Sequence, residues 1–394
     1  MMNNNHSKEE IINQAFQFHA KGNIKEAAKY YQSFIDKGFK DYRVFTNYGV
    51  IFANLGKLQD AETYYRKAIA LKPTFANAHS NLGNVLRDQG KLEDSEQSFR
   101  KAIQLDPKNK SFKNNLINLL TIYEPKVISS NPLYVINEEF LNLGLRKQDK
   151  SIITDEEAIQ LYKDGLKIYR KYNLDLETYS FQIYKSNEIN LNCKRHKLIF
   201  NQKKIIPEFC FGCYKVQVEV GSIIELIKLF LVFNTLELDN NNTRKCLVEG
   251  RSNISGFYKG LIYCLGLTEA LEISKKLNVH IQNNIRTDIT SIVKRGCSEY
   301  PLEFPQYKEI KISGDQTMNY NENWRSIEME IDNGKKDWGN SHKSIAGFNL
   351  SNFLIMRNWI AYAQKIRDQS VNKITNEQIK GPNFFQNLKR DFHS

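Results

Sequence analysis

Apolar and polar positions recur along the first third of the chain at a fixed spacing. Gly22, Gly56 and Gly90 are 34 residues apart, and a proline follows at Pro73 and again at Pro107. Two further sets keep this spacing, one of small residues and one of aromatic residues: Ala15, Gly49 and Gly83, and Tyr31, Tyr65 and Phe99. Small residues allow two helices to approach closely while an aromatic ring fills the gap, glycine ends the first helix, and proline stops the second. The pattern predicts three helical hairpins, at 8–41, 42–75 and 76–109.

With its glycines, prolines and aromatic positions in register, this segment resembles the tetratricopeptide repeat (TPR) family over roughly residues 8–122. A single hairpin cannot bury its apolar face, so repeats of this kind stack into a solenoid. The resemblance implies an all-α solenoid of three repeats. Residues 109–122 would add a capping helix. We expect this array to end near residue 122.

One polar position also follows the repeat. Asn13, Asn47, Asn81 and Asn115 are separated by 34 residues each, and stacked repeats would place them in a row along the concave surface. An amide both donates and accepts hydrogen bonds, so such a row can hold the backbone of an extended peptide. Similar repeat arrays carry asparagine rows of this kind. The alternative is a row of solvated asparagines with no partner.

Some relatives bind acidic C-terminal tails through a clamp of lysine and arginine side chains. In this sequence, Ile12, Asn77 and Asn81 stand where those cations would be needed. The resemblance therefore favours a peptide partner but disfavours that particular class of tail.

Beyond the repeats the pattern changes. Residues 123–153 contain two prolines and are expected to form a linker with one short helix, and 154–368 an α+β domain. Thr154 and Glu157 have the spacing of a capping box, which predicts a helix to about Tyr172. A second helix is expected at 176–184. Residues 369–394 are expected to form a frayed tail.

A cysteine-rich segment lies at 193–213. Cys193 and His196 are separated by two residues, as are Cys210 and Cys213, and short apolar stretches at 197–200 and 204–209 flank a polar turn between them. Two such pairs at the ends of a hairpin are the layout of a zinc ribbon, and a Cys₃His set is a closed structural Zn²⁺ site. The alternatives are scattered buried thiols beside a surface histidine, or an iron–sulfur or redox centre.

The following elements have the order β-α-β-β-α-β, which is typical of a ferredoxin-like unit. The predicted strands are 214–220, 244–249, 257–264 and 279–282, and the predicted helices are 222–234 and 268–277. In that topology Cys246 or Cys264 could approach Cys213 and replace a zinc ligand, or both could simply pack. Two more helices are expected at 323–332 and 352–367.

The composition limits the class of protein but does not indicate a particular function. The 394 residues are 41% hydrophobic and 25% charged, which is typical of a folded soluble protein, and the net charge of +12 is a mild excess. The start of the chain has no apolar signal region, and no apolar run is long enough to cross a bilayer. Six cysteines in such a chain indicate a reducing compartment. We therefore expect a cytoplasmic protein without membrane contact.

These observations favour a TPR-containing interaction or scaffold protein that binds an extended peptide in its concave groove and has a zinc-stabilised C-terminal domain. Two alternatives stay open. One is a nucleic-acid-associated factor that uses the cysteine-rich and ferredoxin-like region. The other is an enzyme of unrecognised type in the C-terminal domain. For the latter, Cys297 lies beside Lys294 and Arg295 and is the best candidate for a lone nucleophile. Because no catalytic motif is present, we favour a non-enzymatic role.

Overall fold

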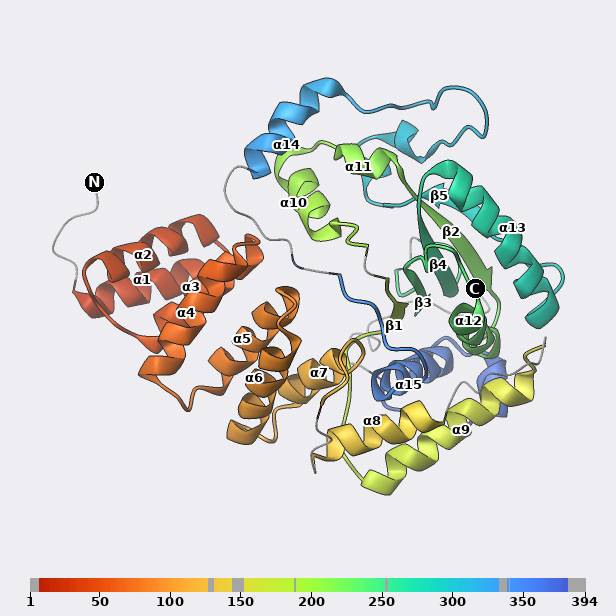
Figure 1. The fold of residues 1–394 in the computed structure, drawn as a ribbon, viewed down its shortest axis with the longest axis horizontal. Coiled ribbons are helices and arrows are strands. Elements are labelled where there is room, and N and C mark those ends of the chain that lie inside the picture. The colour runs from red at the N-terminus through yellow and green to blue at the C-terminus, as the bar shows by residue number, and fades with distance from the viewer. Residues whose placement is uncertain are drawn as a thin grey trace. The chain divides into compact units, whose positions relative to one another are not determined.

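The computed structural model describes residues 7–126, 131–143, 152–187, 189–251, 254–332, 339 and 341–381 (Figure 1). The chain divides into two compact units. The first comprises Met1–Leu119 with Asp332–Asn340, and the second Leu120–Ile331 with Ser341–Ser394. Of the predicted tail, residues 382–394 lie outside the described residues.

The first unit consists of paired helices along the chain (Figure 1). The pairs are α1 (Lys8–Ala20) with α2 (Ile24–Asp36), α3 (Tyr42–Asn54) with α4 (Leu58–Leu71), and α5 (Ala76–Asp88) with α6 (Leu92–Leu105), followed by α7 (Lys110–Leu119). The three predicted hairpins are therefore present, and the helix expected after them is α7. Gly22, Gly56 and Gly90 have φ angles of +73°, +72° and +81°. This left-handed conformation, which favours glycine, ends the first helix of each pair.

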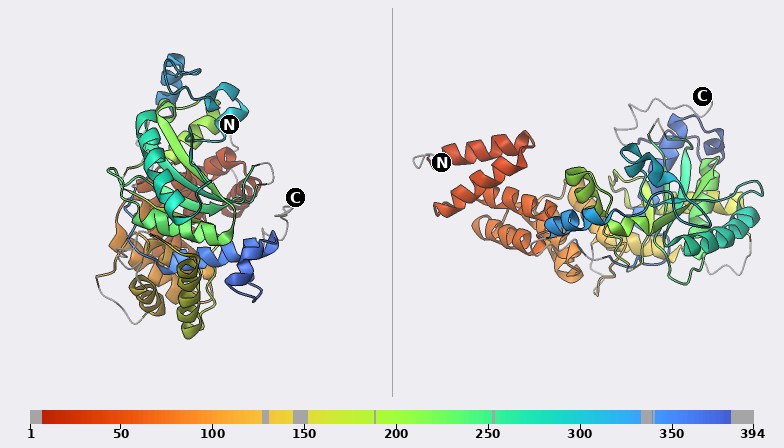
Figure 2. Two further views of the ribbon diagram at one scale, coloured as in Figure 1. Left: turned by 90° about the vertical axis from the view of Figure 1, so that its right-hand side faces the viewer. Right: turned by 90° about the horizontal axis from the view of Figure 1, so that it is seen from above.

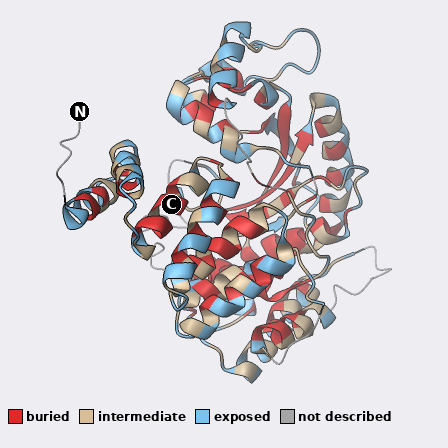
Figure 3. Cartoon of the chain, turned by 60° about the vertical axis from the view of Figure 1, so that its left-hand side comes forward, coloured by how far each residue is buried: buried red, intermediate tan, exposed pale blue. Residues whose placement is uncertain are grey.

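The repeated small residues place helices in direct contact. A Cβ atom added to Gly49 would lie 2.7 Å from the ring of Tyr65, and one added to Gly83 would lie 2.6 Å from the ring of Phe99. Both rings are almost completely buried. The buried residues form stripes along one side of the helices (Figure 3). The second and third pairs thus pack an aromatic ring against bare backbone, as the sequence predicts.

The second unit combines a sheet with helices (Figure 2). Its strands are β1 (Gln182–Lys185), β2 (Cys213–Val220), β3 (Arg244–Val248), β4 (Tyr258–Leu265) and β5 (Ile292–Arg295). Its α-helices are α8 (Pro132–Asn142), α9 (Asp155–Tyr172), α10 (Cys193–Lys203), α11 (Glu208–Phe211), α12 (Ile223–Thr235), α13 (Leu267–Asn284), α14 (Arg325–Asp332) and α15 (Leu350–Lys365).

The strands form one antiparallel sheet with the order β1-β3-β4-β2-β5. Both α12 and α13 pack on one face of it. Gly260 of β4 marks that face, because an added Cβ would lie 2.7 Å from Leu229 and 2.8 Å from Phe233, both in α12. Residues that alternate with Gly260 point to the opposite face. That opposite face carries the site described below.

The hairpin predicted between the cysteine pairs is wrong. Helix α10 spans Cys193–Lys203 and the short helix α11 follows, so the strands expected at 197–200 and 204–209 do not form. His196, Ile199 and Phe200 are all buried. Their spacing of three and four residues places them on one side of a helix, and the burial of that side outweighs the strand-like composition of the short segment.

Two other predicted elements are corrected. The strand expected at 279–282 lies inside α13, where Ile273, Leu277 and Ile281 form one buried helical stripe while Val279 is 58% exposed. The last strand of the sheet is β5 instead. The helix expected at 176–184 is absent, because this segment contributes β1, in which the buried Ile183 pairs with Cys246.

Candidate functional site

The four repeated asparagines occupy equivalent places. Asn13, Asn47, Asn81 and Asn115 are each the sixth residue of a first helix, in α1, α3, α5 and α7 respectively. Asn13 is exposed and the other three are half-buried. Equivalent positions in stacked repeats lie on the same side of the array. The structure thus leaves these amides accessible on helices of one kind.

Two of these amides have neighbours inside the array. Asn115 donates a hydrogen bond of 3.0 Å from Nδ2 to Oγ of Ser80. Burial raises the pKa of Tyr31 to about 12, and the neighbouring amide of Asn47 acts in the opposite direction. His19 also contacts the Tyr31 hydroxyl, at 2.9 Å. These contacts fix the orientation of the amides, while each amide keeps further hydrogen-bonding capacity.

The predicted metal ligands lie in three elements. Cys193 is exposed at the start of α10, Cys210 is buried in α11, and Cys213 is buried as the first residue of β2. The ring of the buried His196 stacks on Phe209 with 5.2 Å between ring centres. Among the described residues, no group of three or more His, Cys, Asp or Glu side chains is placed to hold a metal ion. The arrangement therefore does not present the expected Cys₃His set.

The thiol of Cys210 has other partners. It lies 3.3 Å from the hydroxyl of Tyr300 and interacts with the thiol of Cys297. This interaction raises the pKa of Cys210 and lowers the pKa of Cys297. Cys213 packs against Gly296, where an added Cβ would lie 2.4 Å from its sulfur. Cys297 thus joins the segment around Cys210, although the two are 87 residues apart in the sequence.

Cys246 and Cys264 do not join this cluster. Cys246 pairs with Gly260, and Cys264 lies four residues further along β4, so both point to the face covered by α12 and α13. Cys213 points to the opposite face by strand alternation. Both thiols are almost fully buried in the core, which is the usual environment of a free cysteine.

The uncovered face of the sheet forms the floor of a cavity of about 760 Å³. Its walls come from α10, from residues 249–251 and 254–255, and from residues 296–300. The floor consists of alternate residues of the three central strands: Lys215, Gln217 and Glu219, Lys245 and Leu247, and Lys259, Leu261 and Tyr263. Cys193 and Cys297 also line it.

Charged groups are concentrated in this cavity. Lys259 lies 3.5 Å from Glu249 and 3.9 Å from Glu219, and Arg251 lies 2.8 Å from Glu249. At the other end of the floor, Lys215 is only 7% exposed and stands directly opposite Lys294 on β5. Glu299 lines the cavity wall and raises the pKa of Lys215 electrostatically, but no ion pair joins the two residues. Burial lowers the pKa of Lys215 and of Lys259, and lowers the pKa of Lys245 to about 8.

Sequence reasoning missed these lysines as a group. The sequence does contain a pattern that could have revealed them. Lys215, Gln217 and Glu219 alternate with apolar residues along one predicted strand, and such alternation indicates that one face of the sheet is polar. Alternation does not reveal what covers that face. The cavity forms only because α10 and residues 296–300 fold over it.

Comparison with known proteins decides the nature of the first unit. Residues 49–86 match the family model described as TPR repeat, and residues 76–109 match the model described as tetratricopeptide repeat. The N-terminal segment is a TPR array. None of the curated protein sequences compared with the chain matches it.

Solved structures similar to the TPR array include three from different organisms. The Arabidopsis OM64 TPR domain is 20% identical, with a TM-score of 0.27, and the match covers 28% of this chain and 93% of that one. The second TPR domain of human RPAP3, in complex with an HSP70 peptide, is 23% identical, with a TM-score of 0.26 and coverage of 28% and 91%. The Sgt2 TPR domain from Aspergillus fumigatus is 15% identical, with a TM-score of 0.27 and coverage of 28% and 76%.

Two further features of the TPR array concern its surface. A hollow of about 480 Å³ lies between α4, α5 and α6, and His79, Leu82 and Lys101 are among its lining residues. At the end of α5, the buried Gly339 packs against Asp88, since an added Cβ would lie 3.3 Å from the Asp88 carbonyl oxygen. A residue from the segment 332–340 therefore belongs to the packing of the array.

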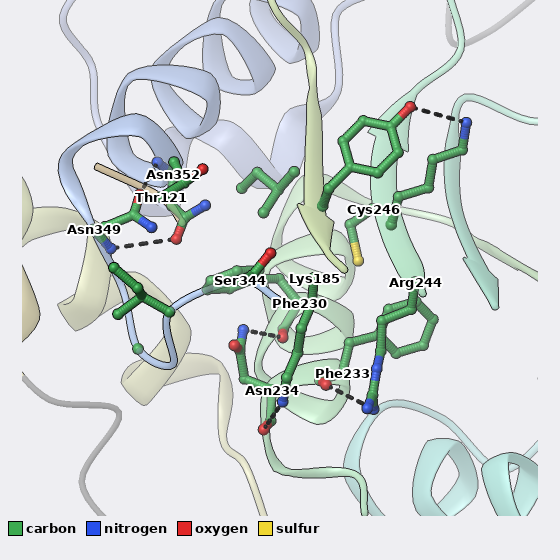
Figure 4. Close-up of a pocket in the computed structure, with 15 residues that line it drawn as sticks. Thr121, Lys185, Phe230, Phe233, Asn234, Arg244, Cys246, Ser344, Asn349 and Asn352 are labelled. Atoms are coloured by element: carbon green, nitrogen blue, oxygen red, sulfur yellow. Dashed lines mark hydrogen bonds between the residues drawn. The ribbon is translucent and has the colours of Figure 1, made fainter. Parts of the chain in front are cut away.

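A second cavity in the other unit is structural. Its volume is about 20 Å³ (Figure 4), which suits about one water molecule. Lys185 donates to the carbonyl of Asn234 at 2.9 Å, and Arg244 donates to the carbonyl of Phe233 at 3.0 Å. Two cations thus bind the last carbonyls of α12 and stabilise its C-terminus.

No helix within the described residues is both long enough and apolar enough to cross a bilayer.

Proposed function

We propose that the chain is an interaction protein whose TPR array binds an extended segment of a partner polypeptide in a concave groove. The observation that carries this proposal is the common position of Asn13, Asn47, Asn81 and Asn115 as the sixth residue of each first helix. A row of amides at the repeat distance can donate to the carbonyls and accept from the N–H groups of a partner backbone. Such recognition tolerates many side chains.

Two of the similar structures are complexes: the first TPR of Spaghetti (RPAP3) is bound to an HSP90 peptide, and the second TPR domain of human RPAP3 to an HSP70 peptide. We do not extend those ligands to this chain. Ile12, Asn77 and Asn81 replace the cations that a clamp for an acidic C-terminal tail would need. The favoured partner is instead an internal, extended segment.

The test is selection of peptides from a random display library on the full-length protein. Selected peptides are expected to lose about threefold to tenfold in affinity for each of Asn47→Ala and Asn81→Ala, since one neutral hydrogen bond contributes about 0.5–1.5 kcal/mol. Gln59→Ala and Gln104→Ala remove exposed amides from second helices instead, and are expected to leave affinity unchanged. Peptides that bind all five proteins equally would contradict the proposal.

For the second unit we propose a ferredoxin-like classification. Supporting it are the element order β2-α12-β3-β4-α13-β5 and the strand order β3-β4-β2-β5 within the sheet, with both helices on one face. Strand β1 extends this unit at the β3 edge. This unit would then provide a second interaction surface in addition to that of the TPR array.

Zinc binding by Cys193, His196, Cys210 and Cys213 stays a prediction from the spacing of these residues. Elemental analysis of the protein purified under reducing conditions tests it, with Cys210→Ser and Cys213→Ser as variants. One zinc per chain that is lost in both variants would support the site. A wild-type protein without bound metal would contradict the proposed zinc site.

A cytoplasmic location, which we propose from the six free cysteines, is tested by localising the tagged protein in cells.

A further inference from the structure

We propose that the cavity on the open face of the sheet binds a small organic anion, whose phosphate or carboxylate group lies between Lys215 and Lys245. This binding site is separate from the groove of the TPR array and does not depend on its function. It is formed by residues of the second unit alone.

Lys215 is the central observation. Its side chain lines the cavity from β2, yet only 7% of the residue is exposed. Within the described part of the chain, no ion pair or hydrogen bond reaches its ammonium group. A buried cation without a partner is costly. An anion in the cavity would supply the missing partner.

The surroundings of Lys215 strengthen this need. Lys294 stands directly opposite on β5, and like charges in opposing positions destabilise a sheet. The Lys245 ammonium lies 5.7 Å from the ring centre of Tyr263, the β4 residue paired with Lys215. Within the described residues it donates hydrogen bonds only to neutral oxygens, at 3.2 Å to Gln182 and 3.5 Å to the Tyr184 hydroxyl. Three lysines thus face one carboxylate, Glu299 in the cavity wall. The excess of positive charge that is left would be relieved by a bound anion.

The opposite end of the cavity is already neutralised. Glu249 accepts hydrogen bonds from Arg251 at 2.8 Å and 2.9 Å and lies 3.5 Å from Lys259, and Glu219 lies 3.9 Å from Lys259. Its carboxylates would repel a second anionic group. The ligand is therefore expected to carry its charge at the Lys215 end only.

The floor also carries apolar surface. Leu247, Leu261 and Tyr263 of β3 and β4 line it beside Gln217, and the cavity volume of about 760 Å³ lies in the range of small-molecule sites. An inorganic ion would leave most of this surface without contacts. A ligand with a carbon skeleton attached to its anionic group uses both the charged end and the apolar floor.

A long polyanion does not fit this arrangement. Lys215 and Lys245 lie in a cavity walled by α10 and residues 296–300, whereas nucleic-acid sites present their cations along an open surface. The chemistry of the site favours one compact ligand.

Isothermal titration calorimetry on the full-length protein tests the proposal with four probes: phenyl phosphate, benzoate, inorganic phosphate and neutral phenol. We expect phenyl phosphate or benzoate to bind more tightly than inorganic phosphate, and phenol to bind more weakly than either organic anion. The first two probes distinguish a phosphate ligand from a carboxylate ligand. Absence of binding by all three anions up to millimolar concentration would overturn the proposal, and binding of inorganic phosphate as tight as that of either organic anion would overturn its organic part.

Two variants locate the site. Lys215→Met and Lys245→Met are each expected to weaken binding by about tenfold or more. Lys275→Met removes an exposed lysine of α13 on the far side of the sheet and is expected to bind as the wild type does. Thermal unfolding of each variant checks folding, and Lys215→Met is not expected to lower the midpoint, because Lys215 has no ion pair or hydrogen bond within the described residues to lose. Folded variants that bind like the wild type would contradict the site.

Discussion

At the residue scale, the packing of the TPR array depends on Gly49 and Gly83. The space that an alanine methyl group would need is occupied by the rings of Tyr65 and Phe99, at 2.7 Å and 2.6 Å. In the first repeat, the equivalent position is Ala15, which is buried together with Tyr31. The position thus holds a small, buried residue in all three repeats.

Gly83→Ala is expected to lower the free energy of unfolding by about 1–2 kcal/mol, because overpacking costs about 1–3 kcal/mol and alanine recovers up to about 1 kcal/mol of helix propensity. The midpoint of thermal unfolding measures the effect. In the double variant with Phe99→Leu, the smaller side chain admits the methyl group, so the two changes should be less destabilising together than their sum. A single Gly83→Ala variant as stable as the wild type would contradict this packing.

The residue scale also shows what the sequence can predict. The spacing of Gly49, Gly83, Tyr65 and Phe99 suffices to place helices and contacts, because a repeat displays the same interaction several times. Lys215 has no such repetition. Its neighbours Lys294 and Lys245 come from other strands, so only the paired register reveals the group.

At the element scale, helix α12 is held at both ends. The Ser222 hydroxyl accepts a hydrogen bond from the backbone of Glu225 at 3.2 Å, and Arg244 binds the carbonyls of Phe233 and Leu236 at 3.0 Å and 2.7 Å. Arg244 is 1% exposed. The cap at Ser222 can be predicted from the sequence because it lies next to the helix. The contact of Arg244 cannot, because this residue belongs to β3.

Arg244→Lys is expected to destabilise the second unit by about 2 kcal/mol. A lysine keeps the charge but not the planar fork, so at least one buried carbonyl loses its donor. Chemical unfolding followed by the fluorescence of Trp324 and Trp359 measures this change. Arg286→Lys, at an exposed arginine, serves as the control with little expected effect. Equal stabilities of the two variants would show that the carbonyl contacts contribute nothing.

The wrong predictions also belong to the element scale. Residues 197–200 and 279–282 are short apolar runs, and periodicity in four residues cannot distinguish a strand from part of a helix. Residues outside these two runs determine that both are helical. His196 extends the buried side of α10. Ile273 and Leu277 belong to the same buried stripe of α13 as Ile281.

At the scale of the whole molecule, the second unit buries cations for which the sequence shows no partner. Burial is the main reason why the pKa values of Lys185 and Lys245 are lowered to about 8. For Lys245, the nearby charge of Lys215 acts in the same direction, whereas Cys193 and Glu299 act in the opposite direction. In the unfolded chain a lysine loses its proton near pH 10.4. Between these values the unfolded state binds more protons than the folded state.

Stability of the second unit is therefore expected to rise as the pH increases from about 8 to about 10. Above that range the buried tyrosines oppose the trend, since burial raises the pKa of Tyr162 to about 12. Unfolding midpoints measured across this interval test the prediction. Lys245→Met should reduce the slope and Lys275→Met should retain it. An equal slope in both variants would contradict the buried state of Lys245.

The central claim is that the TPR array holds a partner by its backbone through the four repeated asparagines. The most direct measurement compares three forms of one selected peptide by fluorescence anisotropy: the original, a scrambled sequence, and a form with N-methylated backbone amides. We predict that the scrambled peptide binds almost as tightly as the original and that the N-methylated peptide binds much more weakly. In the double variant Asn47→Ala/Asn81→Ala, the difference in affinity between the original and the N-methylated peptide should be smaller. Binding that depends on side-chain order and survives N-methylation would contradict the account.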